Sequence, residues 1–199
     1  MHRIITIERQ YGSGGSVIGK LVAENLGIKY YHQEIPQAAA QRYGMDTDVL
    51  IKAEGNRRTS ILYALSLASS PSNTLEGDSP LTDRAFFMES QIIDEIVRRG
   101  EECVIVGRCG NFIADSSLSV YIYSTVEERL KRAVREYGIS QKIAETLLKE
   151  NDSRREIFFN SNTGRNWRQK EQYSLCLNSA ELGDSLCAEI IANIYRNSP

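Results

Sequence analysis

The chain has 199 residues, of which 41% are hydrophobic and 25% charged, and its formal net charge at pH 7 is −2. This length can bury one substantial core and predicts a single domain, 1–199, with insertions. No excess of positive charge exists for tracking nucleic acid or an anionic membrane, so any anion site is expected to be local and to suit a small phosphorylated ligand.

No stretch approaches the roughly 20 consecutive apolar residues that span a membrane, and the N-terminus lacks the apolar region of a signal peptide. We therefore expect a cytoplasmic protein with neither a membrane nor a nucleic acid as its partner. The sequence does not predict the oligomeric state. The four cysteines show no CxxC spacing, and we expect them to be reduced, with neither disulfide nor zinc.

The first segment of the chain predicts a strand, a glycine-rich loop and a helix. Ile4, Ile5 and Ile7 are β-branched and lead into GSGG at 12–15, after which apolar residues recur at helical spacing as far as Leu26. A glycine-rich turn and the helix N-terminus behind it present unpaired backbone N–H groups and the positive end of a dipole, which bind anions. The pattern therefore predicts a phosphate-binding loop.

The Walker form GxxxxGK[ST] fits this segment in two registers. The literal match ends in Gly19 and Lys20, and we reject it because it leaves too short a helix before the next turn. The other register starts at Arg9 and sets Gly15 at the position of the usual lysine and Ser16 at that of the hydroxyl that binds magnesium. In this register the loop has no lysine.

The rest of the chain alternates strands with helices, which predicts a doubly wound parallel sheet. In the last helix, Leu186, Ile190, Ile191 and Ile194 are expected to face inward. Residues 69–80 and 160–170 have few apolar anchors, so we expect both segments to be mobile. The further strands are expected near 29–31, at 103–106, at 118–123 and at 173–178.

Four motifs resemble the cytidylate kinase-like family of P-loop proteins, and the resemblance covers nearly the whole chain. The motifs are ITIERQYGSGG, LGIKYYHQEI, VIVGRCGNFI and YSLCLNS. The resemblance implies an α/β P-loop kinase fold with about five parallel strands and helices on both faces. It also implies a helical insertion that binds the nucleoside monophosphate, at 33–80, and a lid at 140–170.

The activity implied by this resemblance is transfer of the γ-phosphoryl group of ATP, with Mg²⁺, to a nucleoside monophosphate such as CMP or to a similar small acceptor. Arg132 and Arg155 are the expected catalytic residues, and His32, Arg84 and Arg108 are expected to bind the acceptor. Without a ligand, Arg155 is expected to lie several ångströms too far from the Gly12 to Ser16 loop to share one phosphate with it. The expected ligands of the ATP phosphates are Gly12, Ser13, Gly14, Gly15, Ser16 and Val17, with Ser16 also binding the metal.

Several positions depart from the family pattern and leave a second hypothesis open. Gly15 stands where cytidylate kinases have the loop lysine, while His32 and Cys109 stand where acidic residues are usual. The alternative is therefore a catalytically impaired nucleotide-binding module that acts as a sensor or pseudokinase. For Arg84, a solvated position on a helix is the other interpretation.

Overall fold

The structure is a computed structural model and describes residues 2–53 and 81–198. Its five strands form one parallel sheet in the order β2-β3-β1-β4-β5, which confirms the predicted α/β fold. All six residues of β1 are buried, as expected of a central strand covered on both faces. The strands are β1 (Ile4–Arg9), β2 (Lys29–Tyr31), β3 (Cys103–Val106), β4 (Leu118–Tyr123) and β5 (Leu175–Asn178).

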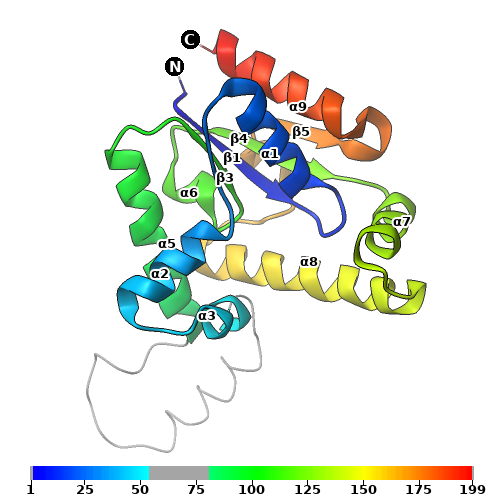
Figure 1. Ribbon diagram of the computed structural model, residues 1–199, viewed down its shortest axis with the longest axis horizontal. Helices are drawn as coiled ribbons and strands as arrows, with labels where there is room; N and C mark the ends of the chain where they lie inside the picture. Colours follow the sequence, from blue (N-terminus) through cyan, green and yellow to red (C-terminus); the bar gives the residue numbers. More distant parts are fainter. Residues whose placement is uncertain (1, 54–80, 199) are drawn as a thin grey trace, which may run out of the picture.

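Helices lie on both faces of the sheet (Figure 1). They are α1 (Gly15–Leu26), α2 (Glu34–Tyr43), α3 (Thr47–Ala53), α5 (Leu81–Arg98), α6 (Gly110–Ile113), α7 (Val126–Tyr137), α8 (Gln141–Thr163) and α9 (Ser179–Asn197), with a short 3₁₀ turn η1 (Lys170–Gln172). The predicted insertion at 33–80 falls largely, and the segment 69–80 wholly, outside the described residues. No helix in the described ranges is long and apolar enough to cross a membrane.

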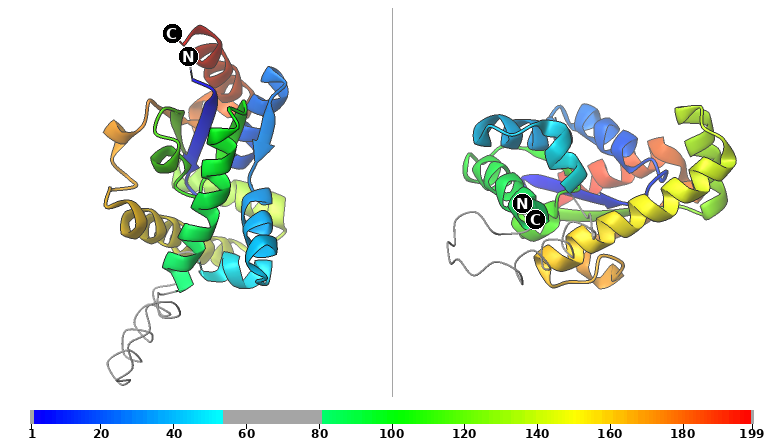
Figure 2. Two further views of the ribbon diagram at one scale, coloured as in Figure 1. Left: turned by 90° about the vertical axis from the view of Figure 1, so that its left-hand side faces the viewer. Right: turned by 90° about the horizontal axis from the view of Figure 1, so that it is seen from below.

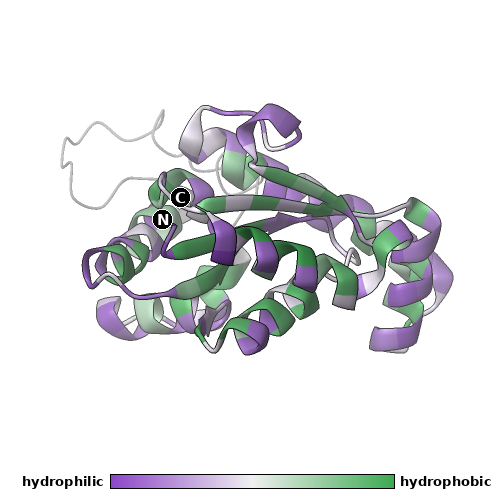
Figure 3. Cartoon of the chain, turned by 90° about the horizontal axis from the view of Figure 1, so that it is seen from above, coloured by the Kyte–Doolittle hydropathy of each residue, from purple (hydrophilic) through white to green (hydrophobic). Residues whose placement is uncertain are grey.

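Two apolar clusters hold the helices against the sheet. On one face, Ile5 and Ile7 pack with α1 and α9, and on the other, Ile4 and Ile105 pack with α2 and α5. Figure 3 shows the apolar strands enclosed by helices whose outer surfaces are hydrophilic. The alternation of side chains along the strands therefore divides the core into two layers.

The inward face of α9 differs from the prediction. Leu186 and Ile194 are 45% and 37% exposed, whereas Cys187, Ala188 and Ile191 are fully buried. Small side chains on this face allow α9 to pack closely against α1, and they give a weaker apolar signal than the larger residues beside them.

Helix α8 is one continuous helix that crosses the molecule beyond the carboxyl ends of the strands (Figures 1 and 2). Beyond its end, Trp167 is fully buried, with its ring 5.3 Å from that of Tyr121 in an edge-to-face contact. The indole Nε1 donates a hydrogen bond of 3.1 Å to Glu8 of β1. Trp167 is thus a fully buried anchor within 160–170, where most of the other side chains are exposed, and the expected mobility of this segment stays a prediction.

We expect Trp167→Ala to lower the free energy of unfolding by about 3–5 kcal/mol, because it leaves a large cavity and removes the donor to Glu8. Phe87→Ala is the control, since this ring is 56% exposed and its loss should change the free energy by no more than about 0.5 kcal/mol. Urea unfolding of both variants measures the difference. Similar losses in the two variants would contradict the anchoring role of Trp167.

Candidate functional site

The glycine-rich loop follows β1 and ends where α1 begins at Gly15. Gly14 caps the helix with φ 79°, a left-handed conformation that glycine adopts without strain. Lys20 is exposed in the body of α1, and Gly19 packs so closely on β3 that a Cβ would lie 2.8 Å from Val106. The Gly-Lys pair of the literal register thus belongs to the helix, and the loop fits the register that starts at Arg9.

Hydrogen bonds hold the loop in shape. The buried Ser13 donates its hydroxyl to the Gln10 carbonyl at 2.8 Å, and its own carbonyl accepts from the hydroxyl of Ser179 at 2.7 Å. The first N–H groups of α1 have no acceptor within the helix and point out of its N-terminus. This arrangement suits the phosphates of ATP, and the partly exposed Ser16 in the first turn suits a magnesium ion bound to them.

A buried ion pair joins the loop to α7 and α8. Arg129 donates to Asp152 at 2.6 Å, and both side chains are less than a tenth exposed. The other oxygen of Asp152 accepts the backbone N–H of Tyr11 at 2.7 Å, while Arg129 also donates to the Tyr11 carbonyl at 3.3 Å. Both backbone groups of Tyr11 are therefore fixed, at the start of the loop.

Arg132 lies directly against the loop. Its Nη1 would be 2.2 Å from a Cβ placed on Gly14, so the absence of a side chain there makes room for the guanidinium. Two hydrogen bonds of 2.9 and 2.7 Å join Arg132 to the carboxylate of Asp184 on α9. A positive group is thus held beside the N–H groups expected to bind phosphate.

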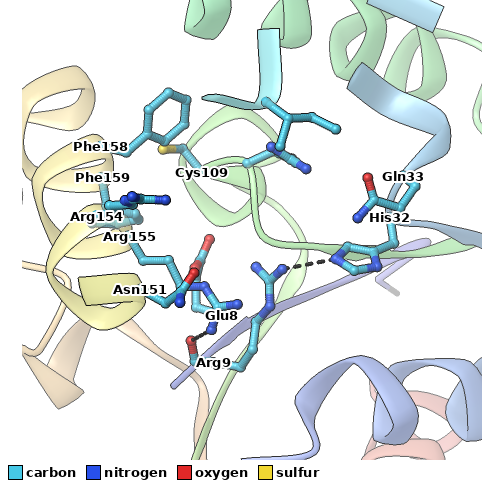
Figure 4. A pocket seen from close by; sticks show the side chains of 12 residues that line it. Glu8, Arg9, His32, Gln33, Cys109, Asn151, Arg154, Arg155, Phe158 and Phe159 are labelled. Carbon is cyan, nitrogen blue, oxygen red and sulfur yellow. Dashed lines mark hydrogen bonds between the residues drawn. The ribbon is translucent and has the colours of Figure 1, made fainter. Parts of the chain in front are cut away.

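A cavity of about 260 Å³ opens beyond the end of β1, between β2, β3 and α8 (Figure 4). Among the described residues, the charged side chains of its lining are four arginines and Glu8, and the polar ones include His32, Gln33 and Asn151. The arginines are Arg9, Arg108, Arg154 and Arg155. Ligands of open α/β sheets bind beyond the carboxyl ends of the strands, and this cavity lies there with an excess of positive charge.

Arg155 contacts the residues that lead into the loop. Its Nη1 donates to the Arg9 carbonyl at 3.0 Å, and its guanidinium carbon lies 5.8 Å from the centre of the Tyr11 ring. These contacts are with residues that precede Gly12, so the expected separation of Arg155 from the Gly12 to Ser16 loop stays a prediction.

Arg108 follows β3 on a strained turn. Arg108 and Cys109 have φ values of 61° and 54°, and Gly107 before them has 77°, so three consecutive residues are left-handed. Nη1 of Arg108 lies 3.3 Å from Glu89 of α5, and both side chains are buried. Burial raises the pKa of Glu89 to about 8, while the adjacent guanidinium favours its ionised form. Backbone strain of this kind is concentrated at functional sites.

His32 follows β2 at the edge of the cavity and accepts a hydrogen bond from Arg9. The distance from Arg9 Nη2 to His32 Nε2 is 3.0 Å. Burial, together with the charges of Arg9, Arg108 and Arg155, lowers the pKa of His32 to about 3. The imidazole is therefore neutral at physiological pH, with Nε2 as the acceptor.

The structure thus brings His32, Arg108 and Arg155 to one cavity and Arg132 to the loop. Arg84 is exposed on α5 and is not among the described residues that line the cavity, so its expected role in binding the acceptor stays a prediction.

Glu8 and Arg9 are residues of the cavity that sequence reasoning missed. They are 5% and 8% exposed, and burial raises the pKa of Glu8 and lowers that of Arg9. The available signal was a pair of adjacent charges at the end of an otherwise apolar strand.

Comparison with known proteins gives the family and the fold. The profile described as the cytidylate kinase-like family matches residues 4–181. No match was found among curated proteins.

Solved structures of similar fold cover nearly the whole chain. An uncharacterized protein from Eubacterium ventriosum is 20% identical, with a TM-score of 0.73 over 98% of this chain and 99% of its own. Shikimate kinase from Acinetobacter baumannii, in complex with shikimate, is 14% identical, with a TM-score of 0.52 over 100% of this chain and 96% of its own. At these identities the likeness establishes the fold alone, which is that of P-loop kinases.

We expect the imidazole of His32 to stay neutral, with the proton on Nδ1, from pH 8 down to pH 5. Its pKa in the folded state lies below the unfolded value of about 6.5, so its contribution to stability is complete above that pH and is lost as the pH falls toward 3. The ¹⁵N shifts of the imidazole across this range measure the protonation state. In Arg9→Met the pKa should rise, because a nearby positive charge is removed; titration of wild-type His32 near pH 6.5 would contradict the assignment.

Proposed function

The chain belongs to the cytidylate kinase-like family, and on this basis we propose that it transfers the γ-phosphoryl group of ATP to a small phosphorylated acceptor. A nucleoside monophosphate such as CMP is the first candidate. The observation that carries the proposal is the position of the phosphate-binding loop and the arginine-lined cavity, which meet at the end of β1. Because the proposed substrates are small molecules, this activity accords with the expected cytoplasmic location.

In the proposed reaction, an acceptor oxygen bonds to the γ-phosphorus as the bond from that phosphorus to the β,γ-bridging oxygen breaks. The products are ADP and the phosphorylated acceptor. A monophosphate acceptor attacks through an oxygen that is already deprotonated, so no general base is required. The protein's task is then positioning and charge stabilisation.

The residues divide between donor and acceptor. The backbone of Gly12 to Val17 would hold the ATP phosphates, with Arg132 beside it. Mg²⁺ bound to those phosphates, to water and to the Ser16 hydroxyl would offset their negative charge. Arg108 and His32 would line the acceptor site, and Arg155 would stabilise charge on the group in transfer.

A second candidate function is a nucleotide-binding module without catalysis. The observation that favours it is Gly15, because the loop lacks the lysine that such kinases use. Release of ADP from ATP and Mg²⁺, measured with a panel of monophosphates and other small phosphorylated acceptors, separates the two. Transfer to any acceptor supports the kinase, whereas ATP binding in calorimetry with no turnover of any acceptor identifies the binding module.

We expect Arg155→Ala to lower kcat by about a hundred- to a thousandfold and to change ATP affinity far less, because its interaction strengthens mainly in the transition state. Lys149→Ala, an exposed change on the same helix, serves as the control and should retain wild-type kcat. Steady-state kinetics and calorimetric titration give the two quantities. Equal losses in kcat and affinity, or no loss in either, would remove Arg155 from the catalytic residues.

A further inference from the structure

Arg9 and Gly15 are the two positions at which the loop departs from the Walker pattern, and they touch each other. We propose that the Arg9 guanidinium supplies, from the end of β1, the positive charge at the γ-phosphate that a lysine at position 15 would otherwise supply, and that His32 positions it. This inference rests on the proposed use of ATP and adds a residue to that site.

Packing at Gly15 gives the first argument. A Cβ placed on Gly15 would lie 2.5 Å from Cβ of Arg9 and 2.8 Å from its Cγ, closer than real Cβ atoms approach. The stem of Arg9 therefore excludes any side chain at position 15, lysine included. The two departures are therefore linked: a large, charged side chain at position 9 requires glycine at position 15. We call this pair of changes the exchange.

The path of the Arg9 side chain gives the second argument. Its Nη1 would be 2.0 Å from a Cβ placed on Gly107, so it crosses the end of β3 through space that only glycine leaves open. Its Nη2 reaches His32 at the end of β2 (Figure 4). The stem thus starts against the loop, and the guanidinium ends in the adjoining cavity beside His32.

The hydrogen bonding of Arg9 gives the third argument. Arg9 is only 8% exposed, lines the cavity, and its Nε has no hydrogen-bond partner within the described part of the chain. His32 accepts a hydrogen bond but is neutral, and the adjacent Glu8 carboxyl attracts Arg9 electrostatically but accepts its hydrogen bond from Trp167. A buried cation with an unused donor is costly unless an anion binds to it.

His32 acts as a positioning residue in this arrangement. Its backbone N–H donates to Glu34 at 2.8 Å, which fixes the residue at the end of β2. The unprotonated Nε2 can then accept from Arg9 and direct the guanidinium across Gly107. A protonated imidazole would repel the arginine and could not accept this bond.

Binding measurements test the proposal without any acceptor. Calorimetry gives the affinities for Mg·ADP and for Mg·AMPPNP, the β,γ-imido analogue of ATP. We expect the wild type to bind AMPPNP more tightly than ADP by about tenfold or more, as hydrogen bonds to a charged group provide. Arg9→Met should bring this ratio close to one and leave the ADP affinity nearly unchanged.

Lys20→Met is the matched control, since it removes an exposed positive charge from α1 and should keep the wild-type ratio. If Arg9 only supports the fold, Arg9→Met will weaken both nucleotides equally or neither, and either result overturns the proposal. Circular dichroism establishes that each variant is folded.

The exchange itself is tested by moving the charge. Gly15→Lys alone should disturb the loop and weaken both nucleotides, because the new Cβ meets the stem of Arg9. Arg9→Gly combined with Gly15→Lys removes that stem and should recover a preference for AMPPNP that Arg9→Gly alone lacks. Normal nucleotide binding by Gly15→Lys, or a folded double variant without the preference, would refute the exchange.

A measurement on the wild type keeps the test independent of folding defects. The ¹⁵N signal of His32 Nε2 reports the hydrogen bond from Arg9 and should move when Mg·AMPPNP binds but not when Mg·ADP binds. The same response to both nucleotides would overturn the proposal. If transfer occurs and the affinity ratio survives in Arg9→Met, this inference alone fails; if no acceptor is phosphorylated but the ratio depends on Arg9, only the proposed transfer fails.

Discussion

Three hydrogen bonds from α8 and the segment after it hold the end of β1, and the geometry of both the loop and the cavity depends on them. Trp167 donates to the side chain of Glu8, Arg155 donates to the Arg9 carbonyl, and Asp152 accepts from the Tyr11 N–H. Asp152 also forms a buried ion pair with Arg129, and both side chains bind the backbone of Tyr11. Because breaking a buried ion pair is strongly destabilising, this pair keeps α8 next to the loop. The charges expected to act on phosphate are therefore preorganised, which is the main requirement of electrostatic catalysis.

On the acceptor side, too, a locally destabilising feature of the structure positions a charged side chain. Three consecutive left-handed residues end at Cys109, and non-glycine residues in this conformation are destabilising. The turn directs Arg108 to the lining of the cavity, and its guanidinium lies 3.3 Å from the buried Glu89 of α5. Burying this pair has a desolvation cost of its own. Because the strained backbone and the desolvation both destabilise the fold, the position of this charge beside a cavity is better explained by ligand binding than by folding.

Local patterns in the sequence predicted most of the fold but few of the hydrogen bonds and ion pairs of the candidate site. The β-branched strand, the glycine cluster and the family motifs gave the parallel sheet and the loop, and the rule for strand ends directed Arg108 to the cleft. Glu8 and Arg9 were missed because their partners are remote: Trp167 is 159 positions from Glu8, and Arg155 is 146 from Arg9. Whether a charge in a strand is buried depends on such partners, and a periodicity carries no information about them.

The missing lysine shows that a sequence motif can also suggest the loss of a function that a residue at another position could supply. Compared position by position with a motif, Gly15 indicates a lost function, because the motif records which residue stands at a position and not where its charge lies. In three dimensions, Arg9 lies against Gly15 and extends into the adjoining cavity, so a substitution at one position can compensate for that at the other. Departures from a motif that touch each other are best interpreted as one change. With the charge supplied by Arg9 as proposed, the absence of lysine at position 15 would no longer separate the binding module from the kinase.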